Sequence, residues 1–293
     1  MARKPIVAGT DGSPRSQTAV NWAVKEAARR ELPLLIVSVA SFGMDAEWLS
    51  APEASHGQTR GMAVRALEDA ASEVSLIDPL LTVDTRLRIG EAGPTLASLD
   101  RDASMIVIGG PGRDGPAASH DSVARYLAGR AHCPVVVGCG DTGRDGHQIV
   151  VGLHDLSSYG PALAFAFDEA AQRDARLLAV HAWYWAPVLG GDSAAFTPAR
   201  VSADALTRLH HLLEPWRWKY PDVEVGEEIL HEHPGRALAE LSASADLLVL
   251  GRHCRGLTGS PTPPGSIIPS LLSHSQAPVA IVPGITETAA QPG

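Results

Sequence analysis

An internal repeat constrains the fold of this chain more than any other feature of its sequence. Three blocks of the first half recur in the second at offsets of 142 or 144 residues: 82–110 on 224–252, 6–14 on 150–158, and 133–138 on 277–282. The second of these matches places Asp11 on Asp155. A repeat that covers nearly all of 293 residues predicts one fold written twice. We expect a first domain over residues 1–141, a second over 147–284, a linker between them, and a loose tail over 285–293.

Strand-like and helix-like segments alternate within each half. Leu34–Ala40 is a continuous apolar run, which is typical of a strand buried on both faces. Ser13 and Pro14 suit the N-cap and first residue of a helix whose apolar side chains recur every three or four residues. The expected strands are 5–9, 34–40, 81–89, 105–108 and 134–137, then 148–152, 177–182, 223–230, 247–250 and 279–282. The expected helices are 16–31, 58–75, 94–102 and 122–131, then 159–173, 200–219, 235–244 and 266–275. This order predicts an α/β fold of two tandem, doubly wound, five-stranded parallel sheets.

Charge and cysteine usage narrow the classes of partner and location. The net charge of −9, with no run of Lys or Arg, makes nucleic acid and anionic membranes poor partners. Cys133, Cys139 and Cys254 form no C-x-x-C pair, which favours a reducing, cytoplasmic location. The longest apolar run, 32–40, is far shorter than the ~20 residues of a membrane span.

Two loops of each half are candidates for a ligand site, because ligands of open α/β sheets bind beyond the carboxyl ends of the strands. In the first half, Asp11 follows the first strand and Gly109 ends the fourth. A helix that begins near Ser122 would direct its N-terminal N–H groups toward an anion. The counterparts in the second half are Asp155, Gly251 and Ser266. Phosphate suits such a position.

These segments resemble the universal stress protein family in its tandem, actinobacterial form. The resemblance is carried by residues 7–14, the G-x-x-G of Gly109 and Gly112, the Ser-Val at 122–123, and CPVVV at 133–137. It implies Rossmann-like domains related to the adenine nucleotide alpha hydrolases, binding ATP with or without magnesium in the stress response. By resemblance, Asp11 and Asp155 contact adenosine, and the backbone at Val39 and Ala182 meets the adenine edge. The phosphates would be held by Gly109, Gly112 and Ser122, or by Gly251, Gly265 and Ser266.

Both copies depart from the family pattern G-x2-G-x9-G-[S/T]. Asp121 occupies the place of the third glycine in the first half, and Cys254 occupies the place of the second glycine in the second. A carboxylate at Asp121 would repel a phosphate unless a magnesium ion bridged the two. We therefore expect the two halves to differ in nucleotide affinity, with the first half weak unless a metal ion is present.

Simpler interpretations remain open for several residues. Asp11 and Asp155 can cap turns, and the glycines can serve the loops alone. His231 and His233 would share one face of a strand end, but no third zinc ligand is fixed by spacing. Cys254 lies among basic residues and is either a reactive thiol or an inert one. The aromatic stretches 183–185 and 216–218 suit sheet cover or an interface better than base stacking.

Three classes of function are compatible with this fold. The first is a nucleotide-binding regulatory module with little or no turnover, and the second is a ligand-free scaffold that acts through dimerisation or partner binding. The third is an enzyme of a related adenine-binding fold, but no Walker motif, H-I-G-H, S-G-G-x-D-S or other catalytic set is present. We therefore expect a regulatory module and no enzyme. We also expect the halves to pair through 133–138 and 277–282, and the chain to form a homodimer.

Overall fold

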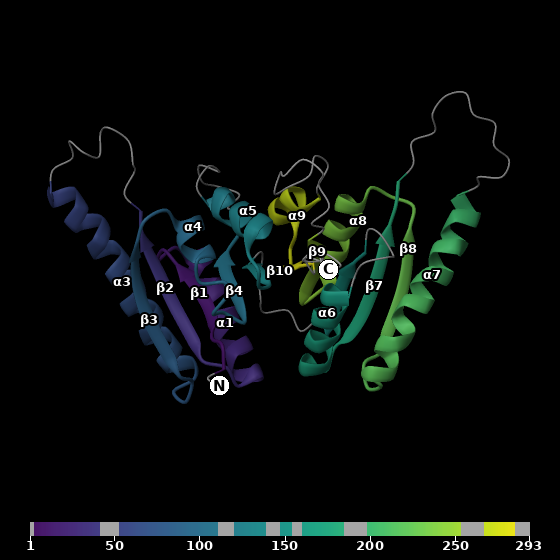
Figure 1. Ribbon diagram of the computed structural model, residues 1–293, viewed down its shortest axis with the longest axis horizontal. Helices are drawn as coiled ribbons and strands as arrows, with labels where there is room; N and C mark the ends of the chain where they lie inside the picture. The colour runs from purple at the N-terminus through teal and green to yellow at the C-terminus, as the bar shows by residue number, and fades with distance from the viewer. Residues whose placement is uncertain are drawn as a thin grey trace, which may run out of the picture. The chain divides into compact units, whose positions relative to one another are not determined.

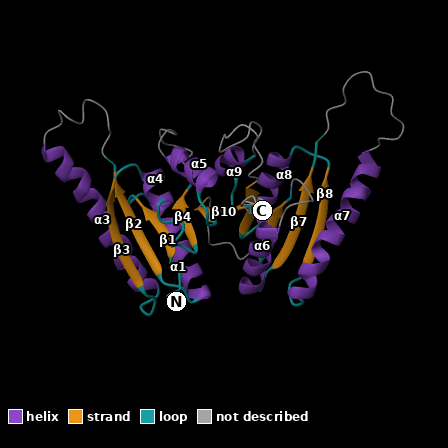
Figure 2. Ribbon diagram, in the orientation of Figure 1, coloured by secondary structure: helices purple, strands orange, loops and turns teal. Residues whose placement is uncertain are grey.

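The computed structural model describes residues 3–41, 53–110, 120–138, 147–153, 160–184, 198–252 and 267–284 (Figure 1). The chain divides into two compact units, Met1–Thr142 and Gly143–Gly293. Each unit contains parallel strands with helices between them (Figure 2). No described helix is both long enough and apolar enough to cross a membrane.

The first unit is a doubly wound parallel sheet. Its elements are β1 (Ile6–Thr10), α1 (Pro14–Arg30), β2 (Leu34–Ala40), α3 (Glu53–Ile77), β3 (Val83–Ile89), α4 (Ala92–Ala97), β4 (Met105–Gly109), α5 (His120–Arg130) and β5 (Val135–Gly138). Its strands lie in the order β3-β2-β1-β4-β5, and every described pair is parallel. The chain therefore runs outward from β1 in one direction and then returns to build the sheet in the other.

The second unit repeats this topology. Its elements are β6 (Gln148–Gly152), α6 (Gly160–Arg173), β7 (Arg176–Ala182), α7 (Pro198–Lys219), β8 (Val225–Leu230), α8 (Pro234–Leu241), the 3-10 turn η1 (Ser242–Ser244), β9 (Leu247–Arg252), α9 (Ile268–His274) and β10 (Val279–Pro283). Within this unit the strand order is β10-β9-β6-β7-β8, again with parallel pairs. The predicted fold class is confirmed in both units.

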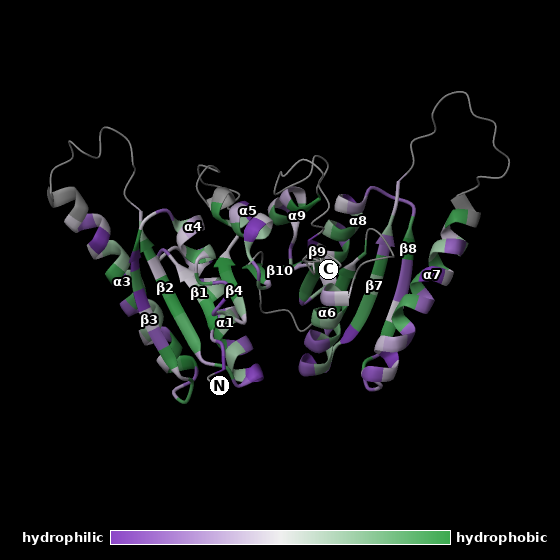
Figure 3. Cartoon of the chain, viewed as in Figure 1, coloured by the Kyte–Doolittle hydropathy of each residue, from purple (hydrophilic) through white to green (hydrophobic). Residues whose placement is uncertain are grey.

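Helices cover both faces of the first sheet. A side chain at Gly9 would point at Leu96 of α4, whereas the next side chain, Thr10, contacts Ser16 of α1. Because neighbouring side chains of a strand point to opposite faces, α1 and α4 lie on opposite faces of the sheet. The central strands are buried between these layers, as the apolar run in β2 predicts, and their ribbons are mostly apolar (Figure 3).

The start of α1 follows its local sequence closely. Ser13 is the N-cap and its hydroxyl accepts a hydrogen bond from the Ser16 N–H, while Pro14 opens the helix. The apolar face predicted for this helix is fully buried, with at most 1% exposure. It consists of Val20, Ala23, Val24 and Ala27.

The predicted helix 94–102 is wrong at both ends, since α4 runs from Ala92 to Ala97. Beyond Ala97 the backbone continues in tight turns, in which Asp100 N–H donates to the Ala97 carbonyl at 3.2 Å. These turns bring the Asp100 carboxylate to the backbone N–H of His132, at 2.8 Å. A contact thirty-two positions along the chain therefore accompanies the early end of α4.

The strand registers correct the predicted repeat at the first strand. Ile6 pairs with Leu34 and Met105, whereas Ile149 pairs with Leu177 and Leu247. The two first strands therefore match at an offset of 143, not 144. Packing gives the same answer, because a side chain at Gly9 would meet Leu96 and Ile108, and one at Gly152 would meet Leu238 and Leu250. The leucine contact lies at 3.2 Å in the first case and 2.8 Å in the second.

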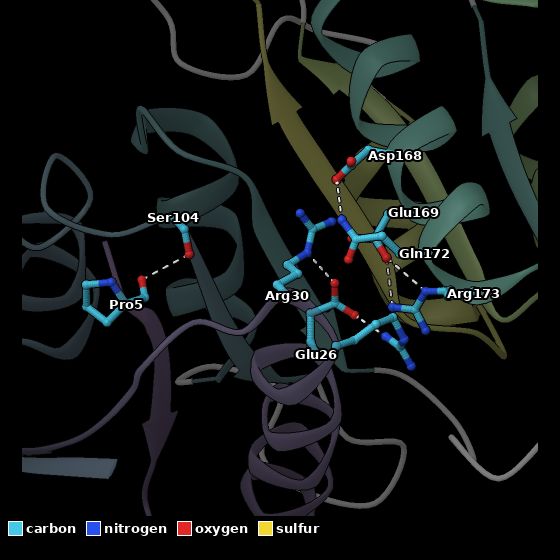
Figure 4. A network of polar contacts seen from close by, with 9 residues as sticks. Pro5, Glu26, Arg30, Ser104, Asp168, Glu169, Gln172 and Arg173 are labelled. Carbon is cyan, nitrogen blue, oxygen red and sulfur yellow. Dashed lines mark hydrogen bonds and ion pairs between the residues drawn. The ribbon is translucent and has the colours of Figure 1, made fainter. Parts of the chain in front are cut away.

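Buried glutamates recur at the matching place of α1 and α6, at the same offset of 143. Glu26 pairs with Arg29 and Arg30, and Glu169 pairs with Arg173 at 2.8 Å (Figure 4). Both glutamate side chains are 0% exposed, so each carboxylate needs a nearby cation to offset its loss of hydration. Figure 4 also shows Ser104 donating to the Pro5 carbonyl, at 3.0 Å, which holds the start of β4 beside the start of β1.

Candidate functional site

The strand order places the ends of β1 and β4, where the two predicted ligand loops of the first unit begin, on neighbouring strands. β1 lies between β2 and β4, and the chain reverses its direction of sheet building between β1 and β4. Parallel strands all end at the same edge of their sheet, so Asp11, Val39 and Gly109 come to one edge. Three predicted site residues that are far apart in sequence are thereby brought together.

Asp11 presents an exposed carboxylate in an ordered turn. Its Oδ1 accepts a hydrogen bond from the Ser13 N–H at 2.9 Å, and the following residue, Gly12, has a φ of +79°. That positive φ favours glycine, which explains the Asp-Gly pair of the sequence. The same carboxylate that was predicted to contact adenosine therefore also caps its own turn, so the two interpretations are compatible.

Gly109 is required by packing within the unit. A Cβ atom at this position would lie 2.9 Å from the Arg15 carbonyl carbon and 2.9 Å from the Ser16 nitrogen. Real Cβ atoms do not approach backbone so closely, so β4 can end against the first turn of α1 only if residue 109 is glycine. By resemblance, Gly109 would help to bind phosphate, but the packing of β4 against α1 is sufficient to explain why this residue is glycine.

The backbone of Val39 faces the end of β1. The Pro33 carbonyl faces β1, where it accepts from the Ile6 N–H at 2.9 Å. The Ala40 carbonyl faces β3, where it accepts from the Gly90 N–H at 3.2 Å. Successive residues of a strand alternate in direction, so the Val39 N–H and C=O lie on the β1 side, at the level where β1 ends. This is the position from which a carbonyl can meet the edge of a base.

Several predicted site residues fall outside the described part of the chain: Gly112, Asp155, Gly265 and Ser266. The backbone of Ser122 lies in the first turn of α5, directly after Asp121, and neither side chain is described. Ala182 ends β7 and Gly251 lies in β9, on the two strands that flank β6. At the corrected offset of 143, the residue that matches Asp11 is His154 rather than Asp155.

Aromatic and histidine side chains occupy the corresponding edge of the second unit. His181 Nδ1 lies 2.7 Å from the Leu153 carbonyl, at the end of β6. Trp183 packs on His231, with ring centroids 4.4 Å apart, and Tyr184 stacks on the same imidazole at 6.3 Å. The strand registers match His181 with Ser38, Trp183 with Ala40, and His231 with Ile89. The ends of β7 and β8 therefore carry much larger side chains than the ends of β2 and β3.

His231 and His233 both lie beyond β8, which ends at Leu230. His231 contacts Trp183, and His233 lies at the N-cap of α8. No group of three or more His, Cys, Asp or Glu side chains that could hold a metal ion occurs among the described residues. Cys254 lies outside them. Trp216 packs on the buried Phe167 and Trp218 is 87% exposed, so one residue of that stretch is sheet cover and another is not.

Sequence comparison assigns the chain to a family. The profile of the universal stress protein family matches twice, over residues 2–137 and 147–283. The chain belongs to the universal stress protein family. Universal stress protein Rv2005c of Mycobacterium tuberculosis is 33% identical over 288 residues, covering 94% of this chain and 96% of the relative. Universal stress protein Rv2623 of the same organism is 31% identical over 268 residues, covering 86% and 87%.

Solved structures support the same tandem fold. A universal stress protein from Archaeoglobus fulgidus superposes with a TM-score of 0.68 at 15% identity, covering 96% of both chains. At this identity the similarity concerns the fold alone. The edge described above is therefore the place in a universal stress protein fold where the strand order reverses.

The sequence alone did not single out Ser16 or Gly9. Ser16 lies 5% exposed beneath the Asp11 turn, and its hydroxyl is within 3.4 Å of four polar atoms of the β1–α1 loop. The S-x-x-S spacing of Ser13 and Ser16 was the available signal. Gly9 carries the packing contact that fixes the repeat register.

Proposed function

We propose that this universal stress protein is a regulatory module that binds an adenine nucleotide, with ATP as the expected ligand, at the carboxyl edge of its first sheet. It binds with or without magnesium and turns the nucleotide over little or not at all. It acts as a cytoplasmic homodimer in the stress response. The second unit contributes a weaker site or none.

One observation carries the proposal: the Asp11 turn, the Val39 backbone and the end of β4 at Gly109 meet at the switch point between β1 and β4. A carboxylate accepts hydrogen bonds from sugar hydroxyls, and a strand carbonyl accepts one from the exocyclic amine of adenine. These two acceptors, at one edge of a sheet, fit the polar groups of an adenosine. No described residues form a metal site, so a magnesium ion would enter with the phosphates.

Titration calorimetry with ATP, with and without magnesium, tests this function in the full chain. Asp11→Ala should weaken binding by about tenfold or more, because the variant loses the charged acceptor. Asp78→Ala is the matched control: Asp78 accepts from the Leu80 N–H at 3.0 Å, in the same kind of turn as Asp11 but before β3 rather than after β1. Asp155→Ala should leave the affinity of the first unit unchanged, since Asp155 belongs to the second unit.

A ligand-free scaffold is the second candidate, and the packing of Gly109 favours it. That glycine is required whether or not a phosphate binds, so it is no independent sign of a ligand. If millimolar ATP and magnesium produce neither heat nor a thermal shift, the scaffold is the better account. Steady phosphate release would instead indicate an enzyme, and a stable species of 30.7 kDa in light scattering would exclude the homodimer.

A further inference from the structure

We propose that Ser16 is a positioning residue that joins the two ligand loops of the first unit, so that the Asp11 carboxylate is held in place by a hydroxyl that does not itself contact the nucleotide. This inference rests on the proposed function for its ligand, and on the described contacts of the β1–α1 loop for its mechanism.

The Ser16 hydroxyl lies at the centre of the β1–α1 loop. It donates to the Ser13 carbonyl at 2.9 Å and accepts from the Asp11 N–H at 3.3 Å. The Thr10 hydroxyl lies 3.2 Å from it and also accepts from the Gly12 N–H, at 3.2 Å. A single buried hydroxyl thereby fixes backbone on both sides of Asp11, directly or through Thr10. The geometry of the Asp11 turn depends on it.

The same residue supports the second loop. The backbone nitrogen of Ser16 is one of the atoms that a Cβ atom at Gly109 would meet at 2.9 Å. The end of β4 therefore rests on the backbone of the residue whose side chain organises the Asp11 turn. A shift of Ser16 would move both loops together, which makes it a mechanical link between them.

The second unit has a different residue in this place. The offset of 143 puts Tyr159 at the position of Ser16 and the apolar Leu153 at that of Thr10. Residues 154–159 lie outside the described part of the chain, and the aligned residues differ in type, so we assign this link to the first unit alone. Its loss would reduce nucleotide binding there and leave the second unit unaffected.

The test compares Ser16→Ala with Thr18→Ala in the full chain by ATP titration calorimetry. Thr18 lies in the same first turns of α1, where its exposed hydroxyl donates to the Pro14 carbonyl at 3.0 Å. We expect Ser16→Ala to raise the Kd for ATP by about tenfold and Thr18→Ala to leave it within about twofold. A Kd unchanged in Ser16→Ala, measured well below its unfolding temperature, would overturn the proposal.

A double-mutant cycle separates positioning from a merely structural role. If Ser16 acts through Asp11, Ser16→Ala should weaken binding much less in the Asp11→Ala background than in the unchanged protein. Fully additive losses would overturn the proposal, because they would mean that Ser16 acts independently of the carboxylate. Gly109→Ala should reproduce the loss by displacing Ser16, whereas Gly138→Ala should not, since its Cβ would lie 3.5 Å from Ala19, an ordinary contact.

Hydrogen exchange distinguishes failure of this inference from failure of the proposed function. Without any ligand, Ser16→Ala should speed exchange of the Asp11 and Gly12 amides by about tenfold relative to Thr18→Ala. If the unchanged protein binds no ATP, the proposed function fails, and faster exchange still supports the link between the loops. Unchanged exchange in Ser16→Ala overturns the link whether or not ATP binds.

Discussion

The two units of this chain keep the same packing inside their sheets and differ where their strands end. Inside each sheet, a leucine packs directly against a glycine of the first strand: Leu96 of α4 against Gly9, and Leu238 of α8 against Gly152. Glu31 and Asp174 both close the first helix of their unit with a φ of 50°. At the carboxyl edge the matched residues diverge in size and polarity: Ser38 and His181, Ala40 and Trp183, Ile89 and His231.

This difference indicates which positions the fold constrains and which it does not. A side chain in place of either glycine would have to displace the leucine methyl groups packed against it, so the close packing of the sheet constrains both positions. Side chains beyond the last strand pair meet no such limit, and a duplicated unit can fill that edge with aromatic rings. In the first unit the buried Ser38 hydroxyl has no hydrogen-bond partner among the described residues. In the second the matching His181 reaches the Leu153 carbonyl.

The largest effect that tests this comparison concerns the aromatic core of the second unit. Phe167 is fully buried and stacks on Trp216 at 5.7 Å and Tyr220 at 5.4 Å, whereas its match in the first unit is Val24. Phe167→Ala should lower the free energy of unfolding of the second unit by ~3–5 kcal/mol. Val24→Ala should cost the first unit about 1.6 kcal/mol, at ~0.8 for each carbon lost.

Limited proteolysis over a temperature series, followed by mass spectrometry, would measure which unit opens first. Phe167→Ala should release peptides of the second unit at lower temperature and leave those of the first nearly unchanged. Equal shifts for both units would show that they unfold as one body and would remove the basis for treating them as separate cores.

A smaller effect on stability is expected at a hydrogen bond that a carboxylate accepts in the first unit and a hydroxyl accepts in the second. The Asp100 carboxylate accepts from the His132 N–H and lies 2.8 Å from its Nδ1; in the second unit the Ser242 hydroxyl accepts from the Gln276 N–H at 3.0 Å. Asp100→Ala should cost about 2 kcal/mol, because it leaves a partly buried N–H unpaired. Asp100→Ser should recover about half of that loss, since a serine has this role in the second unit.

Urea unfolding of the three proteins, with Ser242→Ala as the companion variant at a cost of about 1 kcal/mol, provides the measurement. If Asp100→Ser is no more stable than Asp100→Ala, the carboxylate contributes through its charge and the two contacts are not equivalent.

Much of the fold could be predicted from interactions between residues that are close in sequence. The errors arose where contacts between residues far apart in sequence determine where an element ends or how it aligns. Ser13 and Pro14 were identified as a helix start because capping depends on neighbouring residues alone. The end of α4 was missed because Asp100 pairs with His132, a partner that no local pattern indicates. The repeat was placed one residue out at β1, because matching Asp11 to Asp155 outweighed the glycine packing that only the structure reveals.

The location of the candidate site could be predicted from the sequence, but the residues that hold its loops in place could not. Strand order follows from the alternation of elements, so Asp11, Val39 and Gly109 could be expected at one edge. The role of Ser16 could not, because the S-x-x-S spacing indicates at most a contact with Ser13 and not the hydrogen bonds of its hydroxyl around Asp11. Whether Gly109 serves a ligand or the fold was equally undecided until the distance to Ser16 was known.

The smallest effect concerns Cys133, which the repeat replaces with Ala277 in the second unit. The thiol is 6% exposed, and burial first, then the negative charge of Asp100, raises its pKa from 9.0 to about 12. Well below pH 9 the thiol is protonated in both the folded and the unfolded chain, so its ionisation does not affect stability there. Between pH 9 and about 12 only the unfolded chain ionises it, so the free energy of unfolding falls as the pH rises.

Cys133→Ala copies the second unit and removes this titration. The stability of the unchanged protein relative to the variant should fall by about 1.4 kcal/mol between pH 7 and pH 10, at 1.36 kcal/mol for each pKa unit. Urea unfolding under reducing conditions at both pH values measures it, and all other titrating groups, including the remaining cysteines, cancel in the difference. The same relative stability at both pH values would show that the thiol ionises as easily in the folded unit as in the unfolded chain.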